Sequence, residues 1–303
     1  MGLTSNALLY YKLIRPLHWG KNLIVPFGFL IAAIASRDLG ALISYDLLLK
    51  LLLTFLAASI ISSGNYVLND LVDAKYDKQH PLKMSRVMAS QSFKRANAVF
   101  LMIALFALGL AVAWAVGPYI FLFSALLVVS GILYNVPPLR MKDIAFVDVL
   151  IESANNPLRV LFGWYIIIQE FPPWYLLVFL WAYAGVLMAA KRYSELLYLG
   201  AEKARKYRPV FVTYTLNSIR ISYIAYGISA LATLVYFSTK ARATFLLFSA
   251  LIGVQFIWLY GLMHAKKEYV QKIENFYKLP MFFFYMGVSI CAGILMLILS
   301  YTK

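Results

Sequence analysis

Long apolar stretches alternate with shorter polar segments along the whole chain. A helix needs about 20 apolar residues to cross a bilayer, with a range of roughly 17–25. The pattern therefore predicts an all-α integral membrane protein, in which nine transmembrane helices form a single polytopic domain over residues 1–303. The predicted spans are 22–42, 46–67, 97–116, 119–136, 146–168, 173–190, 220–239, 243–264 and 280–300.

Polar loops of unequal length connect these spans. The long loops alternate with short links and comprise 68–96, 137–145, 191–219 and 265–279. Twenty-two of the 28 Lys and Arg residues lie in the N-terminal segment and the long loops, when Arg220 is counted with the third loop. Basic residues concentrate on the cytoplasmic side of membrane proteins. We therefore expect a multi-pass protein of the cell membrane, with its N-terminus and long loops in the cytoplasm, its C-terminus outside, and any active site open to the cytoplasm.

The composition agrees with a place in the membrane. Of the residues, 62% are hydrophobic and 14% are charged, whereas a soluble domain has about 25% charged residues. The net charge of +15 comes from basic residues spread between the apolar spans, which suits an anionic leaflet or anionic substrates better than nucleic acid. Cys291 is the only cysteine, so an intrachain disulfide is excluded. The polar and basic N-terminal segment lacks the short apolar core of a cleavable signal, and we expect none before the spans.

A cluster of carboxylates follows the second apolar span, in the segment NDLVDAKYDKQHPLKMSR that begins at Asn69. On a helix, Asn65, Asn69 and Asp73 recur every four residues, and Asp70, Asp73 and Asp77 share a neighbouring face. Three carboxylates within two turns repel one another unless a cation lies between them, and Mg²⁺ prefers such oxygen ligands together with substrate phosphates. A solvated, charge-balanced loop is the alternative. The two asparagines just inside the membrane favour a binding site, because polar groups at that depth are costly.

Polar residues also interrupt the fifth apolar span, which reads FVDVLIESANNPLRVLFGW. Helical spacing places five of them on one stripe, namely Asp148, Glu152, Asn155, Asn156 and Arg159. A charge near the bilayer centre costs at least about 2.5–3.5 kcal/mol on insertion scales, so the stripe must face the bundle interior or a wet cavity. An internal structural pair between Glu152 and Arg159 is the alternative interpretation.

Basic residues accompany the aspartates and the other polar segments. Lys83 and Arg86 follow the carboxylates directly, and the turn LYNVPPLRMKD adds Arg140 and Lys142. These cations can bind phosphate oxygens, and an Arg side chain can bind two at once. RPLHWGKN before the first span and KRYSE at the end of the sixth are also rich in polar residues. Anchoring at the membrane interface and snorkelling at a helix end are the alternative explanations for these two segments.

Together these segments resemble the UbiA superfamily of intramembrane prenyltransferases. Its members have nine helices around a central cavity open to lipid, and an N-D-x-x-D-x-x-x-D motif after the second helix. Asn69, Asp70, Asp73 and Asp77 match that motif residue by residue, and YNVPPLRMKD resembles the Tyr, Pro and Arg-x-Lys segment of the family. The similarity in pattern runs over roughly residues 11–300.

A narrower resemblance is to the branch of decaprenyl-phosphate phosphoribosyltransferases. RPLHWGKN, NDLVDAKYDKQHPLK and KRYSELLYLG are similar to segments of that branch. Members that use prenyl diphosphate generally carry a second aspartate motif, D-x-x-x-D, where this chain has Lys191 to Glu195, and no aspartate follows Asp148. One departure lies after Arg86, where VMASQ replaces the usual PIASG and predicts a different loop geometry.

The resemblance implies Mg²⁺-dependent transfer of 5-phosphoribose from phosphoribosyl pyrophosphate to a polyprenyl phosphate, with release of pyrophosphate. It also implies an apolar groove for the polyprenyl tail, the lipid bilayer as surroundings and no nucleic-acid partner; a homo-oligomer is left open. Asp70, Asp73 and Asp77 would be catalytic and, with Asn69, would bind the metal. The residues implied to bind substrate are Asn65, Asn69, Lys21, Lys83, Arg86, Arg140, Lys142, Glu152, Asn156, Arg159, Lys191, Arg192, Tyr193 and Glu195. Within this set, Tyr193 and Glu195 would contact the ribose hydroxyls.

Two other functions are compatible with the sequence. A prenyltransferase with the same fold would move a prenyl group from prenyl diphosphate to an aromatic or other lipid-soluble acceptor, with aromatic side chains shielding the carbocation. A transporter would use Asp148, Glu152 and Arg159 as an ion or proton relay, although a relay does not require the aspartate motif. Mg²⁺-dependent turnover of a phosphorylated donor separates the enzymes from the transporter.

Overall fold

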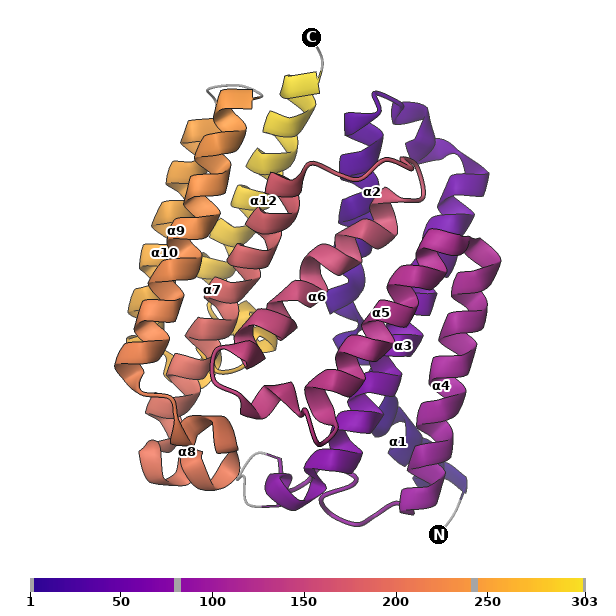
Figure 1. The fold of residues 1–303 in the computed structure, drawn as a ribbon, viewed down its shortest axis with the longest axis vertical. Helices are drawn as coiled ribbons and strands as arrows, with labels where there is room; N and C mark the ends of the chain where they lie inside the picture. Colours follow the sequence, from indigo (N-terminus) through magenta and orange to yellow (C-terminus); the bar gives the residue numbers. More distant parts are fainter. Residues whose placement is uncertain (1–2, 79–82, 241–244, 302–303) are drawn as a thin grey trace.

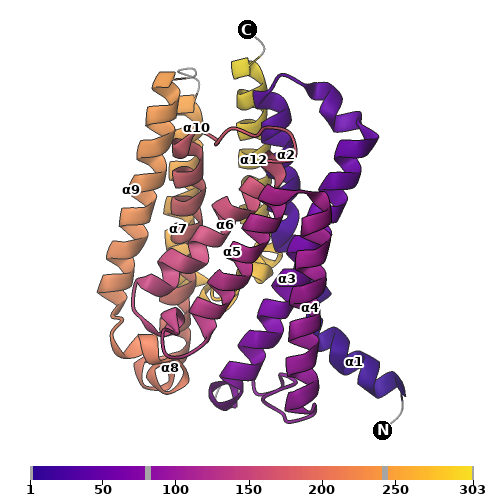
Figure 2. The same ribbon diagram turned by 45° about the vertical axis from the view of Figure 1, so that its right-hand side comes forward.

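The computed structural model describes residues 3–78, 83–240 and 245–301, and every regular element in these ranges is a helix. The helices form one elongated bundle, with the N-terminal helix at one end and the C-terminus at the other (Figure 1). Figure 2 shows the same bundle turned, with α1 projecting from its side. The predicted all-α architecture is confirmed. His80 and the first two residues of the predicted span 243–264 lie outside the described residues.

The α-helices are α1 (Leu3–Ile14), α2 (Ile24–Ala35), α3 (Tyr45–Asp77), α4 (Arg95–Val116), α5 (Pro118–Asn135), α6 (Val147–Trp164), α7 (Trp174–Leu199), α8 (Ala201–Tyr207), α9 (Leu216–Lys240), α10 (Phe245–Ala265), α11 (Lys267–Val270) and α12 (Pro280–Tyr301). Short 3₁₀ helices connect several of them, namely η1 (Pro16–Leu23), η2 (Leu39–Ile43), η3 (Met141–Asp143), η4 (Pro209–Val212) and η5 (Ile273–Lys278).

Eight described segments are long and apolar enough to cross a membrane. The first, Ala7–Ala35, combines part of α1 with η1 and α2; the others are formed by α3, α4, α5, α7, α9, α10 and α12. Each of these seven helices overlaps a predicted span. The remaining predicted span, 146–168, corresponds to α6, which is less apolar because it carries Asp148, Glu152 and Arg159.

The first predicted span, 22–42, is wrong in its bounds. α2 ends at Ala35, and the chain turns at Arg37, which has a positive φ of 58°. Asp38 then caps η2, since its Oδ1 accepts a hydrogen bond from the Ala41 backbone N–H at 3.2 Å. The two charges that interrupt the apolar run therefore mark the turn after the helix, where a carboxylate can satisfy a free backbone N–H group.

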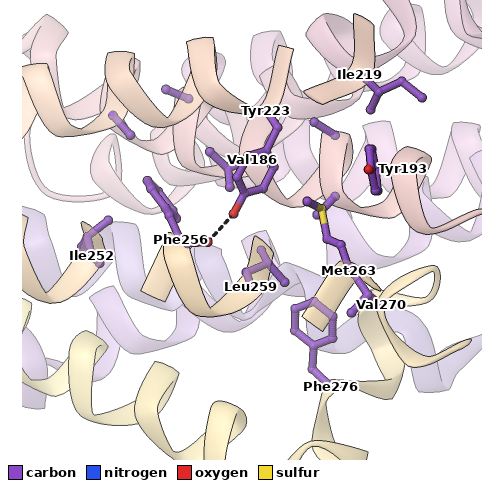
Figure 3. Packing of buried hydrophobic residues seen from close by; sticks show 14 of the residues in the cluster. Val186, Tyr193, Ile219, Tyr223, Ile252, Phe256, Leu259, Met263, Val270 and Phe276 are labelled. Atoms are coloured by element: carbon purple, nitrogen blue, oxygen red, sulfur yellow. Dashed lines mark hydrogen bonds between the residues drawn. The ribbon is translucent and has the colours of Figure 1, made fainter. Parts of the chain in front are cut away.

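Two hydrophobic clusters divide the bundle. One is formed mainly by α7, α9 and α10, and within it Tyr223 donates a hydrogen bond to the carbonyl oxygen of Phe256 at 2.6 Å (Figure 3). The other is formed mainly by α2, α3, α5 and α6. α6 packs against α2 and α5 on one side and against α7 on the other. Side chains of α6 can therefore reach both halves.

α2 and α6 cross with their backbones in contact. A Cβ atom added at Gly28 would lie 2.2 Å from the carbonyl oxygen of Val160, and one added at Gly163 would lie 2.0 Å from that of Val25. Small residues let two helices of a membrane bundle approach this closely. The crossing fixes the position of α6 in the bundle, and with it the position of its polar stripe.

Candidate functional site

A cavity of about 1350 Å³ lies between the two halves of the bundle. Ten cationic and four anionic side chains line it, and most of them lie near the long loops. Between α7, α9, α10 and α12 the lining is mainly apolar and includes Leu180, Leu187, Phe248 and Ile290. A positively charged wall with an apolar branch suits a ligand that is both anionic and lipidic.

The C-terminal end of α3 brings the predicted aspartates to this cavity. α3 continues through Asp77, and Asp70 and Asp77 are only 1% and 2% exposed. The alternative of a solvated, charge-balanced loop is therefore wrong as to solvation, although cations do balance the aspartates. Asn69, Asp70 and Asp73 line the cavity, whereas Asp77 is not among the lining residues.

Arginines from two other segments pair with the buried aspartates. Arg15, in the left-handed conformation just before η1, lies 2.5 Å from Asp70. Arg86 lies 2.8 Å from Asp77 and 3.5 Å from Asp70, so it bridges two carboxylates of the motif. Burial of Arg86 opposes its charge, but Asp70 and Asp77 together raise its pKa above the usual value. The aspartates thus hold the N-terminal segment and the loop before α4 against the end of α3.

Asp73 pairs with the turn between α5 and α6. Its Oδ1 lies 2.8 Å from Arg140 and 2.7 Å from Lys142. Lys142 also donates to the side-chain oxygens of Asn69 at 3.1 Å and Asn135 at 2.8 Å. Burial lowers the pKa of Lys142 to about 8, against the opposing effect of Asp73. Both predicted cations of this turn therefore contact the aspartate motif.

The side chains at the end of α3 offer carboxylate and amide oxygens to a metal ion such as Mg²⁺. The described residues contain no group of three or more His, Cys, Asp or Glu side chains placed to hold a metal ion. Mg²⁺, however, is usually held by one or two carboxylates, with substrate phosphates and water completing its shell. Asp70 and Asp73 meet that requirement, because both line the cavity from one helix with Asn69 beside them. The residues present therefore fit a shared magnesium–phosphate site, and Asp77 lies behind it.

The polar stripe of α6 faces the cavity, as its spacing predicts. Glu152, Asn155, Asn156 and Arg159 all line it. Arg159 donates from Nε to Asn22 at 2.8 Å and from Nη1 to the carbonyl oxygen of Asn155 at 3.0 Å. The ion pairs between described residues do not include Glu152 with Arg159, so the structural-pair alternative is not observed. Glu152 accordingly presents a carboxylate to the cavity wall.

The Lys-Arg-Tyr-Ser-Glu segment ends α7 in a buried ionic network. Arg192 lies 2.6 Å from Asp148 and 3.2 Å from Glu195. Tyr214 donates to the other oxygen of Asp148 at 2.6 Å. Glu195 in turn lies 3.9 Å from Lys83. This network joins α6, α7 and the loop before α4, and Arg192, Glu195 and Lys83 line the cavity.

Lys83 reaches across the polar end of the bundle to α8. Its Nζ donates a hydrogen bond to the hydroxyl of Tyr207 and lies 4.4 Å from the centre of that ring. Burial lowers the pKa of Lys83 to about 7, although Glu195 acts in the opposite direction. Lys83 is therefore a cavity cation whose charge depends on pH near neutrality.

The other predicted residues have different surroundings. Lys21 and Lys191 line the cavity. Asn65 also lines it: its amide nitrogen donates to the carbonyl oxygen of Leu127 at 3.2 Å, and its Oδ1 is buried with no hydrogen-bond partner among the described residues. Tyr193 packs in the hydrophobic cluster of Figure 3 and is not among the lining residues. The structure thus brings six predicted cations to the cavity, namely Lys21, Lys83, Arg86, Arg159, Lys191 and Arg192. Arg140, Lys142 and Tyr193 are not among the lining residues.

Four of the cations that line the cavity were not predicted as site residues from the sequence, namely Lys12, Arg15, Arg208 and Lys272. Arg15 belongs to the segment RPLHWGKN, and its match to Asp70 is a contact across 55 residues that no local pattern shows. Arg208 follows α8 and lines the cavity. The only available signal for Arg208 was the general excess of basic residues in its loop, which equally marks Arg205 and Lys206.

Comparison with known proteins decides the family. The family model described as the UbiA prenyltransferase family matches residues 24–288. The chain belongs to this family. Solved structures of the family share its fold: a UbiA homolog from Archaeoglobus fulgidus bound to GPP and Mg²⁺ has a TM-score of 0.69 and 19% sequence identity, covering 95% of this chain and 99% of that chain. A digeranylgeranylglyceryl phosphate synthase structure has a TM-score of 0.66 and 17% identity, covering 98% and 99%.

Curated relatives support the narrower resemblance. This UbiA-family chain is 28% identical over 211 residues to the decaprenyl-phosphate phosphoribosyltransferase of Mycobacterium tuberculosis, covering 69% of this chain and 67% of that protein. Its counterpart from Mycolicibacterium smegmatis is also 28% identical, with 69% and 63% covered. The nodulation protein NoeC of Azorhizobium caulinodans is 32% identical over 156 residues, covering 52% and 47%. The chain thus spans about two thirds or less of these relatives, and it is a multi-pass membrane transferase of the UbiA family.

Proposed function

We propose that the protein transfers 5-phosphoribose from phosphoribosyl pyrophosphate to a polyprenyl phosphate and releases pyrophosphate. One observation carries this choice: at the end of α3 the cavity wall holds aspartates that are paired with cations, whereas the wall at the end of α7 and after α8 is mainly basic. A prenyl diphosphate brings one anionic group, which a metal at these aspartates would neutralise. Phosphoribosyl pyrophosphate brings a second phosphate, and the acceptor brings another, so a basic second wall suits them.

Asn69, Asp70 and Asp73 would hold Mg²⁺ at the diphosphate of the donor, where the metal supplies neutralising charge for the leaving group. Arg15 and Arg86 lie beside these carboxylates, and we assign them to the remaining diphosphate oxygens. Charge gathered on pyrophosphate as it leaves is stabilised by such preorganised cations.

The transfer itself breaks the bond between the anomeric carbon of ribose and the diphosphate oxygen. An oxygen of the acceptor phosphate forms the new bond from the opposite face, and the electron pair of the broken bond leaves with pyrophosphate. A phosphate monoester is already anionic near pH 7, so no strong general base is required. Arg159, which lines the cavity from α6, is assigned to the acceptor phosphate, and Glu152 and Glu195 to ribose hydroxyls.

The apolar part of the cavity between α7, α9, α10 and α12 would hold the polyprenyl chain. Packing the chain against these apolar side chains removes the apolar surface of both from water, which is favourable. In this proposal α6 also crosses the membrane, which makes nine crossings in a single domain. The N-terminus and the polar end of the cavity then face the cytoplasm of a cell-membrane protein, in agreement with the 22 Lys and Arg residues near that end.

A second candidate is transfer of a prenyl group from prenyl diphosphate to a lipid-soluble acceptor. The observation in its favour is the aromatic part of the cavity lining, which includes Phe179, Tyr183, Phe237, Phe245 and Phe248. Aromatic faces stabilise an allylic cation. The structural relative from Archaeoglobus fulgidus is bound to GPP and Mg²⁺, a donor of this class.

The deciding experiment supplies the purified protein in lipid nanodiscs with Mg²⁺, labelled phosphoribosyl pyrophosphate and a polyprenyl phosphate. We expect a labelled lipid product from wild type. Asp73→Asn should lose at least 100-fold in rate, whereas Asp46→Asn should not, because Asp46 lies exposed at the other end of α3 beside Lys50. Turnover of a prenyl diphosphate with an aromatic acceptor, and none of the ribose donor, would instead establish the second candidate.

A further inference from the structure

The two sides of the cavity differ in charge balance. At the end of α3, four carboxylates lie 2.5–2.8 Å from four cations, so the charges of these eight side chains balance. The carboxylates are those of Asp70, Asp73, Asp77 and Asp143, and the cations are Arg15, Arg86, Arg140 and Lys142. A divalent cation would add two positive charges there, which the diphosphate of a ligand would offset.

The opposite side carries an excess of positive charge. Four cations line the cavity there, which we call the basic cluster: Lys83, Lys191, Arg192 and Arg208. Within the cluster, Arg192 contacts Asp148 and Glu195, and Lys83 lies 3.9 Å from Glu195. Cations therefore outnumber these two carboxylates on this wall, which suits an anionic ligand better than a metal.

Arg208 is the member of the basic cluster whose backbone is fixed from both sides. Its N–H bonds the carbonyl oxygen of Ala204 at 2.9 Å, and its carbonyl oxygen accepts from Phe211 at 3.1 Å. Val210 and Phe211 of η4 are fully buried and anchor the segment in the hydrophobic cluster of the α7 half. The guanidinium carbon lies 5.7 Å from the centre of the Tyr207 ring. Arg208 therefore enters the cavity from a rigid support.

Part of the Arg208 guanidinium has no acceptor in the protein. Its Nη1 is buried and has no hydrogen-bond partner among the described residues. Buried donors are nearly always paired, because a buried donor without an acceptor has lost its hydrogen bonds to water. Burial opposes the charge of Arg208, but Glu195 and Tyr207 raise its pKa well above the usual value, so it stays cationic. An oxygen acceptor supplied by a ligand would complete this group.

We infer that Arg208 is the centre of a second anion subsite, which binds a phosphate monoester that is not held by the metal. This deepens the proposed function and rests on it: the monoester is either the 5-phosphate of the ribose donor or the phosphate of the lipid acceptor. Both phosphates have three oxygen acceptors, and a guanidinium can donate two parallel hydrogen bonds to such a group. Prenyl diphosphates have no such second group.

Binding without turnover tests the subsite. Ribose 5-phosphate and farnesyl phosphate are titrated separately, without Mg²⁺, into the full chain in nanodiscs, and binding is measured calorimetrically. We expect Arg208→Gln to weaken at least one of them tenfold or more, while Mg²⁺-dependent binding of pyrophosphate is kept. Loss for ribose 5-phosphate assigns the subsite to the donor, and loss for farnesyl phosphate assigns it to the acceptor. Equal binding of both compounds by wild type and Arg208→Gln overturns the inference.

Two further variants control for folding. Arg205→Gln removes an exposed arginine from α8, one turn before Arg208, and should bind both compounds as wild type does. Arg208→Lys keeps the charge but not the paired donors, and should bind more weakly than wild type even if Arg208→Gln fails to fold. Wild-type affinity in Arg208→Lys and Arg205→Gln alike would count against the subsite.

The outcome is separable from that of the proposed function. If the wild-type protein transfers no phosphoribose but Arg208→Gln loses monoester binding, the subsite stands and the proposed reaction fails. If wild type transfers phosphoribose and Arg208→Gln leaves the KM of both substrates unchanged, the reaction stands and the subsite fails.

Discussion

Arg192 and Asp148 form an ion pair inside the bundle, with 2.6 Å between Nε and Oδ2 and side chains that are only 1% and 0% exposed. The pair joins the end of α7 to the start of α6, and so ties the basic wall of the cavity to the helix that carries its polar stripe. Removal of one partner from a buried pair leaves the other charge without compensation. This makes the pair a structural support of the site as well as part of its wall.

Arg192→Met should therefore lower the free energy of unfolding by about 3–5 kcal/mol, the cost of breaking a buried pair. The double variant Asp148→Asn, Arg192→Met should recover part of this loss, because no unpaired charge is then buried. Lys50→Met, at the exposed pair with Asp46, should cost at most about 1 kcal/mol. Thermal unfolding in detergent measures all three. A loss in Arg192→Met as small as that in Lys50→Met would show that Asp148 finds another partner.

Lys83 should couple donor binding to proton uptake. Its pKa in the free protein is lowered to about 7 by burial, so at pH 8 most molecules hold it neutral. A bound phosphate favours the charged form, and the protein should therefore take up close to one proton per donor bound at pH 8, and less at pH 6. Calorimetric titrations in buffers of different ionisation enthalpy measure this uptake.

Lys83→Arg should abolish the uptake, because arginine is charged throughout this range, and Lys94→Arg at the exposed start of α4 should not. The low pKa of Lys83 also makes the stability of the ligand-free protein depend on pH. Between about pH 7 and 10.5 the folded state binds fewer protons at Lys83 than the unfolded state, so this group favours folding increasingly as the pH rises. An uptake that persists in Lys83→Arg would assign the proton to another group.

Gln91 is held in the left-handed backbone conformation, with φ of 57°. In the branch that the chain resembles, glycine usually occupies this position of the loop. The left-handed conformation costs a residue with a Cβ atom roughly 1–2 kcal/mol. Glycine avoids this cost, but it loses more conformational entropy on folding, which offsets part of the gain. Gln91→Gly should therefore stabilise the protein by about 0.5–1 kcal/mol. Gln91→Ala keeps the Cβ atom and should not, and an equal gain from both variants would locate the effect in the Gln side chain.

For the same loop, the sequence predicts a departure from the related proteins but not the contacts that the loop makes. The change from PIASG to VMASQ predicts a different loop geometry, which stays a prediction. Val87 and Met88 of this loop are buried with Leu13 of α1 and Ala98 of α4. Which helices they would meet was not available from the sequence, because these contacts are far apart along the chain.

Periodicity and motif spacing predicted most of the spans, the aspartates and the inward stripe of α6, since each depends on residues within a few turns. Partner choice depends on three-dimensional packing, so the pairing of Arg140 with Asp73 was not predicted. Tyr193 illustrates the same limit: its neighbours Arg192 and Glu195 line the cavity, but its own direction on α7 places it against α10, 5.1 Å from the ring of His264.

The crossing of α2 and α6 gives the last prediction. A Cβ at Gly163 would lie 2.0 Å from the carbonyl oxygen of Val25, and backbone cannot yield as a side chain does. Gly163→Ala should therefore destabilise the protein by at least about 1–3 kcal/mol, the usual cost of overpacking. Gly261→Ala, in α10 with nothing within 4 Å, should instead stabilise by up to about 1 kcal/mol.

Activity should separate these two variants further. A displacement of α6 moves Glu152 and Arg159 relative to the aspartates of α3, and small errors in position are costly when two reactants must be aligned. Gly163→Ala should thus lose transferase activity well below its unfolding temperature, while Gly261→Ala keeps it. Full activity in Gly163→Ala at a temperature where the protein is folded would mean that the bundle absorbs the displacement without moving the polar stripe. The close crossing would then serve stability alone, and the alignment of the site would depend on the pair of Asp148 with Arg192.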